Sequence, residues 1–236
     1  MPLPAYPRAG PADFGAGLCA AFLQALPVTG VAVSAFPGRI PETSIWATDA
    51  ISARIDELQF DLGEGPRWEA ARTRQPVELP DVRQASHAAW PVFAKALQEL
   101  DVAALFVFPL VLGTMDIGVI ELYSTTPGAL VRADHSTALQ LADAAAWKLL
   151  RHLLTAHSVG EPSSRRDESP LSRREVHQAT GMVLAQAGVS ATDALLLLRA
   201  RAYSQGRSVR DVAQEVVNRT MDFSPAPGDE GTAGVK

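Results

Sequence analysis

Two kinds of hydrophobic spacing alternate along the first 157 residues. Apolar residues recur every three or four positions in some segments, which predicts helices, and form short uninterrupted runs in others, which predicts strands. The predicted helices cover residues 13–26, 68–73, 91–100 and 133–157. The predicted strands cover residues 28–36, 44–48, 77–79, 103–109 and 116–123. A short turn at 111–115 indicates a hairpin, and the mixed order favours an α+β sandwich, an antiparallel sheet with helices, over a parallel doubly wound sheet.

The pattern changes after residue 157. Residues 158–170 are rich in Ser, Pro and charge and lack apolar periodicity, which is typical of a linker. Beyond the linker only helical spacing recurs, with predicted helices over 171–187, 191–205 and 209–217. The second part is therefore expected to be an all-α three-helix bundle.

Helix-end signals support these three helices. Gly188 and Gly206 follow the first two helices at the position where a left-handed residue ends a helix, and Ser190 and Ser208 precede the next two as N-caps. The expected organisation is a domain over 12–157, a linker over 158–170, a helical domain over 171–223 and a disordered tail over 224–236.

Composition narrows the class of protein. The 236 residues are 47% hydrophobic and 20% charged, which is enough for a substantial core. Cys19 is the single cysteine, so the chain forms no internal disulfide and no cysteine-based metal cluster. There is no signal-peptide pattern and no apolar run of membrane-spanning length. We expect a soluble, cytoplasmic protein without a metal, a cofactor or membrane contact.

Charge is distributed unevenly between the two parts. Residues 1–164 hold 11 Lys and Arg against 17 Asp and Glu, whereas residues 165–219 hold 9 Arg against 6 acidic residues. An acidic part joined to a basic part is typical of two domains with different partners. Taken alone, however, this imbalance is also within ordinary surface variation.

Four segments in the first part resemble a GAF domain, a small-molecule sensing and dimerisation module. They are Leu62–Pro66, Gln75–Asp81, Trp90–Phe93 and the end of the predicted hairpin, Ile117–Tyr123. The resemblance covers about residues 12–156. It implies that any ligand lies between the sheet and the overlying loops.

Four residues are candidates to line such a ligand pocket: Trp68, His87, Trp90 and Phe93. The alternative, slightly favoured, is that these side chains simply plug a degenerate pocket. His87 has no carboxylate placed to complete a catalytic triad, so no catalytic residue is predicted.

Three blocks in the second part resemble an ANTAR domain, the three-helix RNA-binding module of bacterial transcription antitermination regulators. They are Val176–Val183, the segment from Ala194 to Ala202, and Ser208–Ala213. The resemblance covers about residues 168–223, and the GAF-then-ANTAR order resembles a common actinobacterial regulator type. ANTAR sequences often carry Lys before the glycine of the first helix, where this chain has Thr180.

RNA binding requires cations for phosphates and side chains that reach unpaired bases. The ANTAR resemblance implies contacts with stem-loop RNA, and arginine suits bidentate phosphate and guanine contacts. The candidate RNA-binding residues are Arg173, Arg174, His177, Gln178, Arg199, Arg201, Ser204, Arg207 and Arg210. The alternative is that they form solvated helix faces, with Arg199 paired to Asp193 or Asp211.

Two further residues of the second part have structural interpretations. Gly181 is expected to permit close helix packing. Tyr203 is interpreted as a residue at the edge of the core, although its ring could also stack on a base.

A homodimer is predicted from the long helix over 133–157. One side of this helix is apolar, at Leu139, Ala142, Ala146, Leu149, Leu150 and Leu153. We expect this side to pair with its copy, while Pro162 and Pro170 argue against one unbroken coiled coil.

Three classes of function can be compared with the two parts of the chain. A regulator that senses or dimerises through one domain and binds RNA through the other explains both parts. A free methionine sulfoxide reductase, an activity of some GAF-like domains, uses several cysteines and leaves the second part unexplained. A DNA-binding regulator is disfavoured because the third helix presents mostly Val and Ala.

Overall fold

The computed structural model describes residues 11–36, 42–84, 88–158 and 173–224 of the chain. The chain divides into two compact units, one up to residue 172 and one from residue 173 onward.

The first unit is built on one five-stranded antiparallel sheet with strand order β2-β1-β5-β4-β3. The strands are β1 (Gly30–Ala35), β2 (Thr43–Ala47), β3 (Val77–Leu79), β4 (Ala104–Leu112) and β5 (Met115–Ser124). β4 and β5 form the predicted hairpin, but the turn is only Gly113 and Thr114, with Gly113 in the left-handed region (φ 60°). The two strands therefore extend further toward the turn than their apolar pattern indicated.

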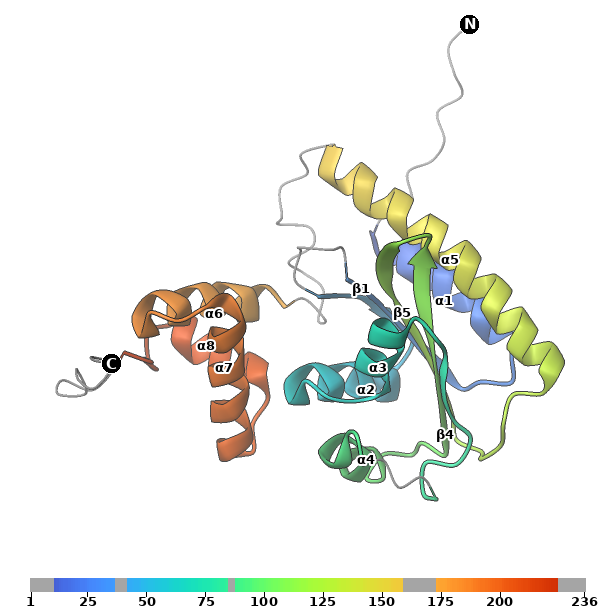
Figure 1. The fold of residues 1–236 in the computed structure, drawn as a ribbon, viewed down its shortest axis with the longest axis horizontal. Helices are drawn as coiled ribbons and strands as arrows, with labels where there is room; N and C mark the ends of the chain where they lie inside the picture. Colours follow the sequence, from blue (N-terminus) through green and yellow to red (C-terminus); the bar gives the residue numbers. More distant parts are fainter. Residues whose placement is uncertain (1–10, 37–41, 85–87, 159–172, 225–236) are drawn as a thin grey trace, which may run out of the picture. The chain divides into compact units, whose positions relative to one another are not determined.

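Helices cover both faces of this sheet (Figure 1). α1 (Pro11–Ala25) and α5 (Arg132–Ser158) lie side by side on one face, where the Phe14 ring stacks on His152 with ring centroids 4.1 Å apart. α2 (Ala50–Leu62), α3 (Pro66–Thr73) and α4 (Pro91–Leu97) cover the other face. Alternate residues of each strand point to opposite faces. This double coverage explains the nearly continuous apolar run that becomes β4.

α2 was not predicted from the sequence. The helix has clear end signals, since Asp49 and Ser52 form a reciprocal capping box and Gly63 ends it in the left-handed region. Its buried face, however, carries the polar residues Ser52, Asp56 and Gln59. The apolar stripe by which an amphipathic helix is recognised in a sequence is therefore interrupted.

The second unit holds three helices: α6 (Arg174–Ala187), α7 (Ala191–Gln205) and α8 (Val209–Val217). The expected caps are confirmed: Gly188 and Gly206 are left-handed, and the hydroxyls of Ser190 and Ser208 accept the N–H groups of Asp193 and Asp211. The core is formed by small apolar side chains: Val176, Ala179, Val183, Ala194, Leu198, Ala202, Val209, Val212, Ala213 and Val216.

The chain after α8 folds back onto the other two helices. The N–H of Phe223 donates to the Gln186 side chain on α6 at 3.1 Å, and the Arg201 guanidinium of α7 lies 5.7 Å from the centre of the Phe223 ring. The residues up to Phe223 therefore belong to the helical unit.

Among the helices in the described ranges, none is long and apolar enough to cross a membrane alone. α6 and α7 meet that requirement only when they are counted together, across a 105° bend.

Candidate functional site

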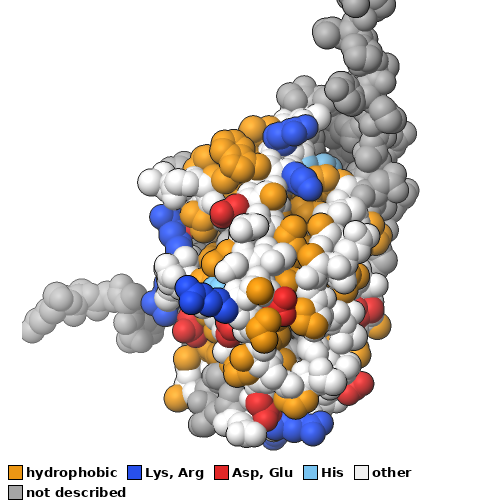
Figure 2. Space-filling model, turned by 90° about the vertical axis from the view of Figure 1, so that its right-hand side faces the viewer, with side chains coloured by type: hydrophobic (Ala, Val, Ile, Leu, Met, Phe, Trp, Pro, Cys, Tyr) orange, Lys and Arg blue, Asp and Glu red, His pale blue; other side chains and the backbone are white. Residues whose placement is uncertain are grey.

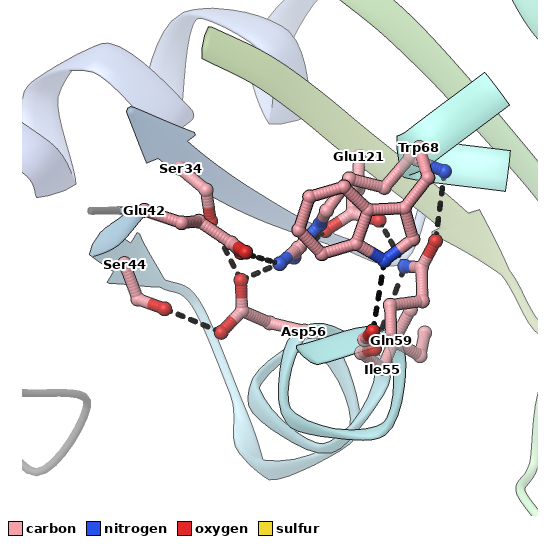
Figure 3. Close-up of polar contacts among 9 residues, drawn as sticks. Ser34, Glu42, Ser44, Ile55, Asp56, Gln59, Trp68 and Glu121 are labelled. Atoms are coloured by element: carbon pink, nitrogen blue, oxygen red, sulfur yellow. Dashed lines mark hydrogen bonds and ion pairs between the residues drawn. The ribbon is translucent and has the colours of Figure 1, made fainter. Parts of the chain in front are cut away.

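A buried ion cluster lies between the sheet and α2 in the first unit. Arg67, the second residue of α3, has a fully buried side chain that donates to three carboxylates (Figure 3). Its Nη1 atom bonds to Glu42, and its Nη2 atom bonds to both Asp56 and Glu121. One guanidinium therefore connects the β2 side of the sheet, helix α2 and strand β5.

Side chains with hydroxyl and amide groups complete the cluster. The hydroxyls of Ser34 on β1 and Ser44 on β2 donate to the two carboxylate oxygens of Asp56 at 2.6 and 2.5 Å. The Gln59 amide nitrogen donates to Glu121, and its oxygen accepts the backbone N–H of Arg67 at 2.8 Å. Each carboxylate is thus held by groups from separate elements, which gives the cluster a defined geometry.

The charges of the cluster do not balance. Burial by itself would lower the pKa of the Arg67 guanidinium, but Asp56, Glu121 and Glu42 raise it well above its usual range. Burial raises the pKa of the Glu121 carboxyl above its ordinary value of 4.5, against the opposing effect of Arg67. With three carboxylates around one cation, Glu121 retains a proton more readily than an exposed glutamate does.

The space beside this cluster is too small for a ligand. The gap beside Glu121 admits no sphere the size of a water molecule, and it is bounded by Ala32, Ser52, Ile55, Leu105, Glu121 and Tyr123. Within the described residues, no group of three or more His, Cys, Asp or Glu side chains is suited to hold a metal ion. The three carboxylates are instead occupied by the guanidinium.

Three of the four candidate pocket residues lie in the described ranges, and each is engaged with neighbouring groups. Phe93 and Trp90 are buried and meet edge to face, with ring centroids 5.8 Å apart. The indole N–H of Trp90 donates to Glu69 at 3.1 Å, and that of half-buried Trp68 donates to the Gln59 carbonyl at 2.9 Å. His87 lies outside the described residues.

Sequence reasoning missed the Arg67 cluster, although one signal was present. Glu121 interrupts an apolar strand whose neighbours Ile120 and Leu122 are fully buried. A carboxylate at such a position needs a buried partner, since an unpaired charge is costly inside a protein. The identity of that partner could not be read from the pattern, because Arg67 is 54 residues away in the chain.

Five of the candidate RNA-binding residues surround the α7–α8 junction in the second unit. All five retain solvent access: Arg199, Arg201, Ser204, Arg207 and Arg210. Arg207 forms an ion pair with Glu215 on α8 at 2.8 Å, and hydrogen bonding to Glu215 raises the pKa of Arg207. The Ser204 hydroxyl donates to the backbone oxygen of Arg201 at 2.8 Å, so it is engaged within its own helix.

The other four candidates lie at the start of α6 and differ in exposure. Arg174 and Gln178 are exposed, and His177 is half-buried. Arg173, which directly precedes the helix, is only 6% exposed. A buried side chain is poorly placed to reach a phosphate, so Arg173 is the weakest of the nine candidates.

Two interpretations of the second unit were wrong. A Cβ atom added to Gly181 would meet nothing within 4 Å, and the residue is exposed, so this glycine does not serve close helix packing inside the unit. Tyr203 is 67% exposed and is therefore not a residue at the edge of the core.

The apolar side of α5 predicted to dimerise is mostly covered by its own sheet. Ala142, Ala146 and Leu149 are buried in the core, while Trp147 and Leu154 are each 60% exposed on another side of the helix. Leu139, which belongs to the predicted side, is 39% exposed. Figure 2 shows hydrophobic side chains spread over the α1–α5 face.

Comparison with known families identifies both units. The GAF domain family matches residues 16–147, and the ANTAR domain family matches residues 168–217. The chain therefore belongs to the GAF domain family and carries an ANTAR domain after it. This architecture is that of a regulatory protein with an RNA-binding module.

Solved structures resemble the first unit. A GAF domain/HD domain protein from Geobacter sulfurreducens is 19% identical with a TM-score of 0.46, covering 61% of this chain and 96% of that one. The GAF domain of a two-component sensor histidine kinase from Bacillus halodurans is 12% identical with a TM-score of 0.48, over the same shares. A type II free methionine-R-sulfoxide reductase from Thermoplasma acidophilum is 16% identical with a TM-score of 0.41, covering 58% and 92%. No curated protein matched the chain.

Proposed function

We propose that this protein is a cytoplasmic, homodimeric transcription antitermination regulator. Its ANTAR domain binds stem-loops in nascent RNA, and its GAF domain brings two copies together. Two linked RNA-binding domains suit paired stem-loops, because the second binding event takes place at a high effective concentration.

The observation that carries this proposal is the group of arginines at the α7–α8 junction. Arg199, Arg201, Arg207 and Arg210 fall within twelve residues around the turn at Gly206, and none is buried. The described part of the second unit contains no lysine, so its cationic surface is arginine alone. Guanidinium groups make bidentate contacts with phosphates and guanine edges, as recognition of folded RNA requires.

Dimerisation is the role that the first unit supports best. Trp147 and Leu154 leave a large apolar surface exposed on α5, and such surfaces mark association sites. The gap beside Glu121 admits no sphere the size of a water molecule. Sensing of a small molecule elsewhere in the GAF domain is the alternative role of the first unit.

The reductase alternative is disfavoured by the state of Cys19. The side chain is fully buried on α1, and burial raises the pKa of its thiol to about 12. A thiol in this state is almost entirely protonated at neutral pH and is a poor nucleophile. A DNA-binding role is disfavoured because α8 turns Val209, Val212 and Val216 into the core.

Binding of the purified full chain to a two-stem-loop RNA and to duplex DNA of equal length tests the proposal. Both titrations are run across a salt series with Arg199→Ala and Arg210→Ala beside the wild type. We expect preference for RNA, and we expect each variant to weaken RNA binding while reducing the salt slope by about one.

The matched control is Arg54→Ala, which removes one exposed arginine from α2 in the other unit. It changes the net charge by the same amount as each of the two ANTAR variants, and it should leave RNA binding unchanged. Equal, weak binding to RNA and DNA that neither ANTAR variant alters would contradict the proposed function.

A further inference from the structure

Tyr203 is the most exposed large apolar side chain in the described residues. It lies in the last turn of α7, three residues before the Gly206 turn, and is 67% exposed. Across the ranges that the structure describes, its ring stacks on no other ring and its hydroxyl has no hydrogen-bond partner. The ring therefore contributes little to the fold of the unit.

Exposing such a ring to solvent is unfavourable, and no ring stacking or hydroxyl hydrogen bond within the described part of this unit compensates for it. A tyrosine offers a large apolar surface, and burying it is favourable by roughly 2 kcal/mol. On α7 the buried positions are Ala194, Leu198 and Ala202, and Tyr203 faces away from them. An aromatic ring held outward at the end of a helix is available to a partner.

Two arginines lie close to Tyr203 along the chain. Arg199 precedes Tyr203 by one helical turn and lies on the same face of α7. Arg207 follows just after the helix, and its guanidinium is held by Glu215 at 2.8 Å and by Gln205 at 3.3 Å. The ring is thus flanked along the chain by two arginines, of which Arg207 is paired with Glu215.

We propose that Tyr203 is the stacking platform for an unpaired loop base of the RNA, between phosphate contacts made by Arg199 and Arg207. This inference rests on the proposed function and adds the residue that distinguishes a loop from a continuous duplex. Unpaired bases expose a π-face that stacks on aromatic side chains, whereas bases inside a duplex stack on each other.

RNA is favoured over a protein partner because residues 168–217 match the ANTAR domain family. Tyrosine and arginine are both enriched at protein interfaces as well, so the residue types by themselves do not distinguish the two partners. A protein partner is the competing interpretation. It is suggested by Leu196, which is 62% exposed and lies two turns before Tyr203 on the same face of α7. A protein partner that covers this face would use Leu196 as well as Tyr203.

The test measures binding of a stem-loop RNA to the full-length wild type and to Tyr203→Ala, Tyr203→Phe and Leu196→Ala. Each protein is titrated with the intact loop and with loops that carry one abasic nucleotide at each position in turn. We expect Tyr203→Ala to bind about 5- to 150-fold more weakly, as loss of one stacked base predicts. Tyr203→Phe retains the ring and should bind within about twofold of wild type.

Two further readouts separate stacking from other roles. One abasic position should weaken the wild type but have no added effect on Tyr203→Ala, because the contact is already absent. Tyr203→Ala should keep the wild-type salt slope, whereas Arg207→Ala should reduce it by about one.

Several outcomes would overturn the inference. Wild-type affinity of Tyr203→Ala would do so, and so would an equal loss in Tyr203→Phe, which keeps the ring. An equal loss in Leu196→Ala would also do so, because it would assign the effect to the whole face of α7 and not to the ring. If RNA binding is retained and depends on Arg199 but not on Tyr203, only this inference fails. If the wild type does not prefer RNA, the proposed function fails together with it.

Discussion

Arg67 on α3 and Glu121 on β5 are ion-paired in the interior of the GAF domain, although 54 residues separate them in the chain. Neither side chain is more than 2% exposed. The same guanidinium also binds Asp56 on α2, so the pair joins the sheet to the helices that cover it.

Replacement of Arg67 by methionine should strongly destabilise the GAF domain. The variant leaves Glu42, Asp56 and Glu121 buried without a counter-charge, and breaking a buried ion pair in this way costs about 3–5 kcal/mol. Urea unfolding followed by tryptophan fluorescence measures the effect selectively, because all four tryptophans lie in the first unit. Arg54→Met is the control: its exposed pair with Glu57 should contribute less than about 1 kcal/mol. A loss similar to that of the control would contradict the prediction.

Glu121 should make the stability of the GAF domain depend on pH. Its pKa in the folded state is raised above 4.5, so the stabilisation from its proton is complete below about pH 4.5 and is lost as pH rises through the folded pKa. Glu121→Gln stays uncharged throughout. The free energy of unfolding of the variant should therefore improve relative to wild type as pH rises. Urea titrations at intervals from pH 4.5 to 8 measure this difference, and parallel curves would show that Glu121 ionises normally.

Cys19 should be unreactive in the native protein. Burial raises the pKa of its thiol to about 12. A thiol-specific disulfide reagent at pH 8 reacts only with a sulfur atom that it can reach and that is deprotonated. We expect no fast labelling of the folded chain and one equivalent after unfolding in urea, measured by absorbance. Rapid labelling without denaturant would mean that α1 opens readily.

Gly181→Ala should stabilise α6. Glycine inside a helix is less favourable than alanine by about 0.5–1 kcal/mol, and the added Cβ meets nothing within 4 Å. Slower hydrogen exchange of the α6 amides in the full chain is the expected result. Faster exchange would show that this position does require glycine.

Trp147→Glu should weaken the proposed homodimer. A central tryptophan commonly contributes more than 2 kcal/mol to an interface, so the dissociation constant should rise by at least about 30-fold. Sedimentation at micromolar concentration measures the mass of each variant. Met115→Glu is the control, since Met115 is 50% exposed at the hairpin turn beside the Arg74–Asp116 ion pair. A monomeric wild type, or a Trp147→Glu dimer as stable as wild type, would rule out this interface.

Local signals were sufficient for most elements. Ser190, Gly206 and Ser208 determine the ends of α7 and α8 through contacts within four residues, so their effect is visible in the sequence. The same holds for β4, whose long apolar run reflects burial on both faces of the sheet. Helix α2 was missed because its inward face is polar, and those polar groups are satisfied only by residues distant in the chain.

Some features of the candidate sites likewise follow from the sequence, and others depend on the tertiary structure. The types of residue at the α7–α8 junction and the order of the two domains follow from the sequence alone, because they depend on composition and spacing along one helix. The assembly of the Arg67 cluster and the outward direction of Tyr203 and Trp147 depend on tertiary packing. Charge neutralisation and burial are set by neighbours from other elements, and a linear pattern does not specify which elements meet.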